Sequence, residues 1–328
     1  MPFRLRQLIV ILCLVALGSC SSPTAPPPPP PDAPTLTCPA SVSLVSPDGA
    51  RVPFPFPLPT PVNGKAPVTV SCTGPSGAGF PAGPTVVTCT ATDALSRQAS
   101  CNFTVTVTVT PKIALTKFLA FGDSITYGRC GPAPNECPQY TVRLEQLLRE
   151  RYTSQNFLMV TRGVPGERTS GGGSRLPDEV SAYNPEVVLL MEGTNDVTND
   201  VKLNESEDAL EYMINAARSR GAKAVFIATI PPIAPGGPNS SAIPKVLLLN
   251  AEIRDLAART GAHLVDVYAA LNADVNRYYV GNDLHPTGEG LRVIGETFYA
   301  KIREKLDITP IGNLQSGIFN LKSPVGRR

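Results

Sequence analysis

The sequence predicts an α/β domain built on a parallel sheet, preceded by a small all-β sandwich. Between about residues 112 and 308, short apolar runs typical of buried strands alternate with longer amphipathic stretches typical of helices. Between about 35 and 111, short stretches rich in β-branched residues are separated by turn residues. Strands that alternate with helices form parallel sheets with helices on both faces, whereas short strands and turns alone favour a sandwich.

The α/β prediction depends on five apolar runs and on the helical patterns between them. The expected strands are residues 118–121, 157–160, 187–191, 224–228 and 263–267. The expected helices include residues 142–152, 207–220, 245–260 and 287–306. In a parallel sheet, the carboxyl ends of the strands lie along one edge, and open α/β sheets bind ligands there.

The first residues have the features of an export signal. Arg4 and Arg6 precede an apolar run, residues 8–17, that is too short to span a bilayer, and small residues precede Cys20. The stretch Leu-Gly-Ser-Cys resembles the lipobox of bacterial lipoproteins. This resemblance implies removal of residues 1–19, lipidation of Cys20 and attachment to a membrane of the bacterial cell envelope, facing the periplasm or the exterior. An ordinary secretory signal is the alternative.

Proline and cysteine usage fit an exported protein. Residues 20–34 contain the proline run 26–31, which favours an extended linker. Besides Cys13 and Cys20, six cysteines remain, and an even number in an oxidising compartment predicts three disulfides. They are Cys38, Cys72, Cys89, Cys101, Cys130 and Cys137. The last two flank a Gly/Pro-rich loop and are expected to pair, while the pairing of the first four stays open.

The all-β segment, residues 35–111, resembles a hyalin-repeat (HYR) module. The resemblance rests on residues 80–93, FPAGPTVVTCTATD, followed by CNFTV at residues 101–105. It implies an immunoglobulin-like module associated with extracellular adhesion or spacing. We expect a passive stalk here, and contact with a surface glycan or protein is the alternative.

Polar segments directly follow the first three expected strands of the α/β domain. They are residues 122–125, 162–166 and 192–196. Because parallel strands end at a common edge, these segments are expected to converge. The charges of the whole chain, 29 Lys and Arg against 27 Asp and Glu, are nearly balanced and give no basic field for nucleic acid.

The residue types in these segments predict acyl transfer. Ser124 becomes a useful nucleophile beside a base, and His285, which precedes the last expected helix, is the candidate. A tetrahedral intermediate also needs hydrogen-bond donors for its oxyanion. The expected donors are the backbone N–H groups of Ser124 and Gly163 and the side-chain amide of Asn195.

These blocks resemble the superfamily of SGNH (GDSL-type) hydrolases. Gly-Asp-Ser at Ser124, the glycine at Gly163, Gly-x-Asn-Asp at Asn195 and His-Pro at His285 occur in the family's order. The resemblance implies a flavodoxin-like three-layer α/β/α domain with a five-stranded parallel sheet. It also implies a serine esterase that cleaves carboxylic esters without a metal or an organic cofactor. The substrate would be a small-molecule or carbohydrate ester.

Two positions depart from the family pattern. The block-two asparagine is replaced by Thr161, and the aspartate three residues before the histidine is replaced by Asn282. An amide cannot stabilise an imidazolium as a carboxylate does. We therefore expect Asp283, the nearest carboxylate in the sequence, to orient His285. Asn282 or a backbone carbonyl are the alternatives.

Other interpretations stay open at this stage. An acyltransferase or a polysaccharide O-deacetylase would use the same site, and the missing aspartate favours an inactive glycan-binding adhesin. His263 is expected to be a packing residue. The glycine triplet 171–173 is expected to form a mobile rim of the active site, and residues 309–328 form a tail without a clear signal.

Overall fold

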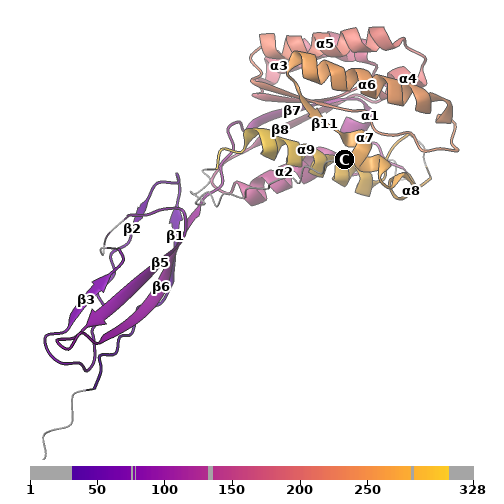
Figure 1. Cartoon of the computed structure of the whole chain (residues 1–328). Coiled ribbons are helices and arrows are strands. Elements are labelled where there is room, and N and C mark those ends of the chain that lie inside the picture. Colours follow the sequence, from indigo (N-terminus) through magenta and orange to yellow (C-terminus); the bar gives the residue numbers. More distant parts are fainter. Residues whose placement is uncertain (1–31, 75–76, 78, 132–135, 282–283, 310–328) are drawn as a thin grey trace, which may run out of the picture. The chain divides into compact units, whose positions relative to one another are not determined.

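The computed structural model describes residues 32–309 except 75–76, 78, 132–135 and 282–283 (Figure 1). The expected signal peptide and Cys20 lie outside the described residues, and so does the tail from residue 310 onward. Within the described part of the chain, no helix has the length and apolar character needed to cross a membrane.

Contacts within the chain define two compact units. Among the described residues, the first unit comprises residues 32–39, 57–73 and 88–102, and the second comprises residues 40–56, 74–87 and 103–309 with the gaps given above. The domain limits expected from the sequence stay a prediction.

The all-β region contains a four-stranded sheet in the order β1-β6-β5-β3. Its strands are β1 (Val42–Ser46), β3 (Thr69–Cys72), β5 (Gly83–Thr92) and β6 (Gln98–Val109), and β2 (Val52–Pro53) pairs separately with β4 (Gly79–Phe80). Alternation along β6 buries Phe103, Val105 and Val107 and leaves the threonines between them more exposed. The expected immunoglobulin-like module is confirmed.

Three disulfides join the six cysteines that the sequence analysis assigned to the exported protein. The expected bond between Cys130 and Cys137 is present. In the β-module, Cys38 pairs with Cys101, and Cys72 pairs with Cys89. The second of these bonds links directly paired residues of β3 and β5. That register depends on the fold of the module, which is why spacing alone left the pairing open.

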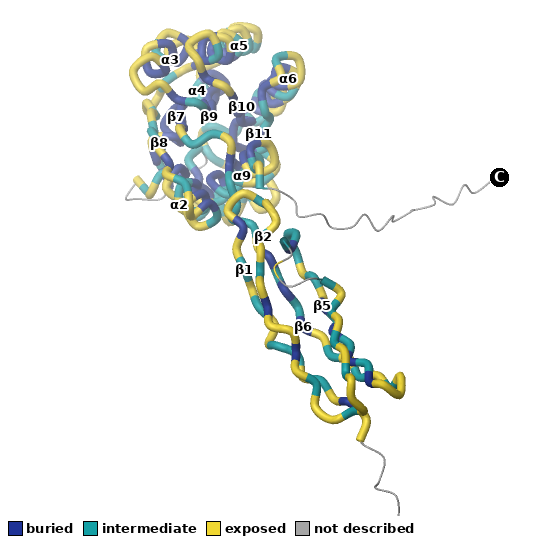
Figure 2. Tube along the Cα trace, turned by 90° about the vertical axis from the view of Figure 1, so that its left-hand side faces the viewer, coloured by how far each residue is buried: buried dark blue, intermediate teal, exposed yellow. Residues whose placement is uncertain are grey.

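The α/β domain contains the expected five-stranded parallel sheet, in the order β11-β10-β9-β7-β8. The strands are β7 (Lys117–Gly122), β8 (Leu158–Gly163), β9 (Val187–Met191), β10 (Ala224–Ala228) and β11 (His263–Val265). Every residue of β9 and β10 is buried, and dark blue marks these central strands in Figure 2. The unbroken apolar runs in the sequence reflect burial on both faces of the sheet.

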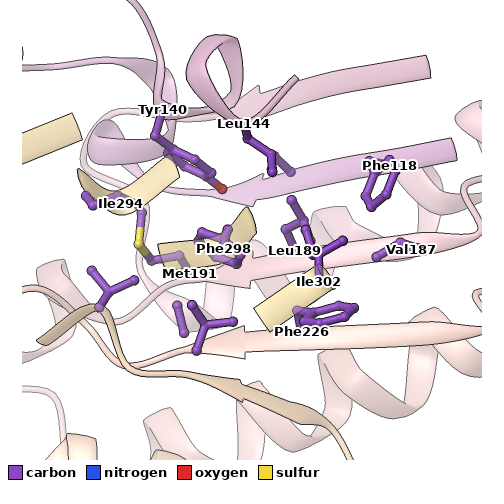
Figure 3. Close-up of a cluster of buried hydrophobic side chains, with 14 of the residues drawn as sticks. Phe118, Tyr140, Leu144, Val187, Leu189, Met191, Phe226, Ile294, Phe298 and Ile302 are labelled. Atoms are coloured by element: carbon purple, nitrogen blue, oxygen red, sulfur yellow. The ribbon is translucent and has the colours of Figure 1, made fainter. Parts of the chain in front are cut away.

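Helices cover both faces of this sheet. α2 (Tyr140–Arg151), α7 (Val267–Asn272) and α9 (Gly288–Leu306) pack on one face, and α3 (Thr169–Tyr183), α5 (Leu203–Ser219) and α6 (Ile243–Thr260) pack on the other. Figure 3 shows the first interface, where Tyr140 and Phe298 stack with ring centroids 5.2 Å apart. Short helices α1 (Ser124–Tyr127), α4 (Thr194–Thr198) and α8 (Val275–Tyr278) and the 3₁₀ helix at Ser240–Ala242 lie in the connections.

Helix α3 was missed by the sequence analysis. It contains the glycine triplet 171–173 and Pro177, residues that are unfavourable inside an isolated helix. The triplet therefore lies within a helix, and the expectation of a mobile rim was wrong. Close packing accounts for the glycine at position 172, because a Cβ there would lie 3.3 Å from the Phe121 ring and 3.3 Å from the Met213 sulfur. Tertiary contacts here outweigh helix propensity.

Candidate active site

A tight turn between β7 and α1 positions Ser124. The Oδ1 atom of Asp123 accepts a hydrogen bond from the Ile125 amide at 2.9 Å and caps the short helix. Gly122 permits the turn, because a Cβ there would lie 2.2 Å from the Met191 carbonyl oxygen. The serine begins the helix with 6% of its surface exposed. Its hydroxyl is thus held at the carboxyl end of the sheet.

His285 reaches the same edge from a segment far away in the sequence. Its Nε2 atom lies 2.9 Å from the Ser124 Oγ atom. The chain around the histidine is tied to the loop after α1, because the Gly131 amide donates to the Pro286 carbonyl at 3.3 Å. The Cys130–Cys137 disulfide closes that loop, and the Cys137 sulfur packs against Gly288 at the start of α9. The structure therefore brings the predicted nucleophile and base together.

Asn195, in α4 directly after β9, is held by the loop that follows β8. Its Nδ2 group donates to the Glu167 carbonyl oxygen at 2.8 Å. A primary amide carries two donor hydrogens, so this bond uses one and fixes the direction of the other. Next to it, Asp196 accepts hydrogen bonds from Thr169 and Ser206 and anchors α4 in the protein. These bonds give Asp196, the last residue of the Gly-x-Asn-Asp block, a structural role.

Gly163 has a different role from the expected one. It pairs with Gly122 in the parallel register of β7 and β8, and the next amide, that of Val164, donates to the Gly122 carbonyl at 3.0 Å. Successive amides of a strand point in opposite directions, so the Gly163 amide points away from β7 and from Ser124, which follows β7. A Cβ at residue 163 would lie 2.1 Å from the Tyr127 nitrogen. The glycine therefore permits close packing against α1.

Gly166 is the residue of this loop that the sequence analysis passed over. It has a left-handed φ of +79°, and a Cβ there would meet no atom within 4 Å. Close packing thus does not account for this glycine, whereas its backbone angle does. It directly precedes Glu167, the partner of Asn195. The signal in the sequence is the Val-Pro-Gly turn after the strand, which brings the Glu167 carbonyl to the asparagine side chain.

Buried acidic side chains lie beneath these groups. Asp123, Glu192 and Asp196 are each 1% exposed. Burial, helped by the negative charges of Asp196 and Glu167, raises the pKa of Asp123 to about 7. Burial and the nearby carboxylates of Asp123 and Glu167 raise the pKa of Glu192 well above its usual range. In the described part of the chain, no acidic, histidine or cysteine side chains are grouped as a metal ion requires.

The remaining residues named in the sequence analysis are partly described. Asp283 and Asn282 lie outside the described residues, so the group that orients His285 stays a prediction. The Thr161 hydroxyl lies 2.8 Å from the Thr141 hydroxyl and links β8 to α2. The His263 ring packs 4.8 Å from the Phe226 ring, in agreement with a packing role.

Comparisons with known proteins give the same picture for both parts of the chain. The model of the GDSL-like lipase/acylhydrolase family matches residues 120–293, and the model of the HYR domain matches residues 31–107. No curated protein matches the sequence.

Among solved structures, an acetylxylan esterase from Geobacillus stearothermophilus is 23% identical, with a TM-score of 0.51 over 58% of this chain and 96% of that chain. A lipase/acylhydrolase from Enterococcus faecalis is 22% identical, with a TM-score of 0.53 over 60% and 100%. At these identities the likeness shows the fold.

The raised pKa of Asp123 gives a testable pH dependence. Its pKa is about 7 in the folded protein and 3.8 in a free carboxyl, so the folded state binds more protons between these values. The free energy of unfolding should therefore fall as pH rises through this window, by up to about 4 kcal/mol. Asp123→Asn stays neutral and keeps the capping oxygen, so it should flatten this fall. Urea unfolding at about pH 4 and about pH 8 measures the difference.

A matched control is Asp178→Asn, on the exposed side of α3, which should keep the wild-type pH dependence. An unchanged slope in Asp123→Asn would contradict the raised pKa of this buried carboxyl.

Proposed function

Because the chain belongs to the GDSL-like lipase/acylhydrolase family and is a carboxylic ester hydrolase, we propose that it works through an acyl-enzyme on Ser124 with His285 as general base. The observation that carries the proposal is the 2.9 Å contact between the Ser124 Oγ and His285 Nε2 atoms. That distance suits transfer of the hydroxyl proton to the imidazole.

The reaction has two halves in this proposal. The Ser124 Oγ atom attacks the ester carbonyl carbon while its proton passes to the His285 Nε2 atom. The tetrahedral intermediate then expels the alcohol, which takes that proton, and leaves the acyl group on the serine. A water molecule attacks the acyl-enzyme with His285 again as base, and this releases the carboxylic acid and restores Ser124.

The oxyanion would be bound by the backbone N–H of Ser124 and by the Asn195 amide. We assign the third donor to the N–H of Gly166 in place of the N–H of Gly163. Two observations support this change: the Gly163 amide points away from β7, and Gly166 precedes the residue that holds Asn195. Donors fixed before the reaction stabilise developing charge without reorganisation.

We propose acetyl or other short acyl esters of carbohydrates as the substrate class. The similar solved structures include acetylxylan esterases, which supports a carbohydrate ester. The HYR module would space the enzyme from a bacterial membrane to which lipidated Cys20 attaches it, through the proline-rich linker. This arrangement would give access to polymers at the cell surface or in the periplasm.

The nucleophile is tested with a fluorophosphonate probe and a short-chain aryl ester. Wild-type protein should be labelled at Ser124, because an adjacent base activates this hydroxyl, and Ser124→Ala should lose both labelling and hydrolysis. Ser170→Ala, which removes an exposed serine at the start of α3, is the matched control and should behave as wild type. A wild-type protein without labelling at Ser124 would favour the inactive adhesin.

The group that orients His285 is tested by Asp283→Ala and Asn282→Ala. If Asp283 stabilises the imidazolium, its loss should lower kcat by up to about 10⁴-fold, and Asn282→Ala should have a smaller effect. Full turnover in Asp283→Ala would refute this assignment. A large loss in Asn282→Ala alone would assign the role to the amide instead.

Substrate class is tested with acetylated xylo-oligosaccharides beside acetyl, butyryl and long-chain aryl esters. We expect the highest kcat/KM for acetyl groups on the oligosaccharide and a decline with acyl length. A preference for long acyl chains would contradict the carbohydrate ester. Acyl transfer to an added alcohol in excess of hydrolysis would identify a transferase.

A further inference from the structure

The loop of residues 164–168 carries one donor of the proposed oxyanion hole and the carbonyl that orients another, and an arginine from α3 holds this loop. The loop contributes the Gly166 amide and the Glu167 carbonyl that orients Asn195. Arg175 binds the Glu167 side chain through two nitrogens: its Nε atom donates to Oε1 at 2.9 Å, and its Nη2 atom donates to Oε2. A forked pair of this kind fixes direction as well as distance.

Arg175 is itself fixed by groups at the ends of two strands. Its guanidinium carbon lies 3.9 Å from the centroid of the Phe121 ring in β7. Its Nη2 atom approaches the Gly122 carbonyl at 3.4 Å, and both terminal nitrogens approach the Arg162 carbonyl at 3.3 to 3.4 Å. The arginine thus connects Glu167 with the strands that lead to Ser124 and to the loop.

The surroundings of this ion pair are protected from water. The Arg175 side chain is 20% exposed and the Glu167 side chain is 8% exposed. The charged and titratable groups that face them are Glu179 on α3, whose Oε1 atom lies 3.3 Å from Arg175, and the buried carboxyls of Asp123 and Glu192. Without Arg175, the Glu167 carboxyl would lose its forked partner and remain beside these acids.

We propose that Arg175 is a positioning residue for the oxyanion hole, which acts by clamping Glu167 and so fixing the carbonyl that directs the Asn195 amide. The inference rests on the proposed role of Asn195 in ester hydrolysis. Arg175 acts only through other residues. Its contribution therefore belongs to the transition state, in which the asparagine binds the charged oxygen, more than to substrate binding.

A double-mutant cycle between Arg175 and Asn195 tests this proposal, with kcat and KM for a short-chain aryl ester as readouts. Asn195→Ala should lower kcat by about 10²- to 10³-fold. Arg175→Gln should lower kcat by about 10-fold and change KM by less than about 2-fold. In the double variant, kcat should fall no more than about 3-fold below that of Asn195→Ala, because the amide that Arg175 positions is already gone.

Arg162→Gln is the matched control. This arginine binds Glu179 from β8, with its Nε atom 2.9 Å from each carboxylate oxygen. It shares an acidic partner with Arg175, so its loss tests the effect of removing a positive charge from the same cluster. We expect near wild-type kcat in Arg162→Gln, and no further loss when this change is added to Asn195→Ala.

The possible outcomes separate the two proposals. Equal fold-losses from Arg175→Gln with and without Asn195, or unchanged kcat in Arg175→Gln, would overturn the positioning role and leave the esterase mechanism intact. Full activity in Asn195→Ala would instead refute the oxyanion role of Asn195, and the inference about Arg175 with it. If Arg175→Gln fails to fold, Arg175→Lys and Glu167→Gln enter the same cycle. Lysine keeps the charge without the fork, so an intermediate kcat is expected.

Discussion

A hydrogen bond of 2.9 Å joins the Ser124 hydroxyl to the His285 imidazole across 161 positions of the sequence. Such a contact exists only if the first and last crossovers of the sheet end at the same edge, which parallel strands impose. The buried strands, the glycine at residue 122 and the disulfide-closed loop that binds Pro286 all maintain this geometry. The ester chemistry proposed for the protein depends on that one juxtaposition.

Beneath the contact, the protein accepts an unfavourable electrostatic arrangement. Asp123 and Glu192 are buried close to Glu167, and their burial, together with the neighbouring carboxylates, raises the pKa of both side chains. Arg175 supplies a positive charge to this group of acids through its ion pair with Glu167. Asp123, Glu167 and Glu192 thus follow the ends of β7, β8 and β9, where the polar groups of the site emerge.

Much of this could be predicted from the sequence, because the strong signals are local. Unbroken apolar runs predicted all five strands of the parallel sheet. The blocks at Ser124 and His285 predicted two side chains that lie in contact, whereas Gly163 in the second block was given the wrong role. Helix α3 was missed because its glycines and Pro177 lower helix propensity, and the close packing of Gly172 against Phe121 and Met213 appears only in the folded structure. The direction of the Gly163 amide depends on strand register, and the roles of Glu167 and Arg175 depend on tertiary packing. No local pattern encodes either.

The most direct test of the account is a crystal structure of the protein inactivated by a fluorophosphonate, in which the phosphoryl oxygen takes the place of the oxyanion. The account predicts phosphorus bound to the Ser124 Oγ atom. It places the phosphoryl oxygen about 3 Å from the N–H groups of Ser124 and Gly166 and from the Asn195 amide. A phosphoryl oxygen turned away from Asn195, or an adduct at another residue, would contradict it.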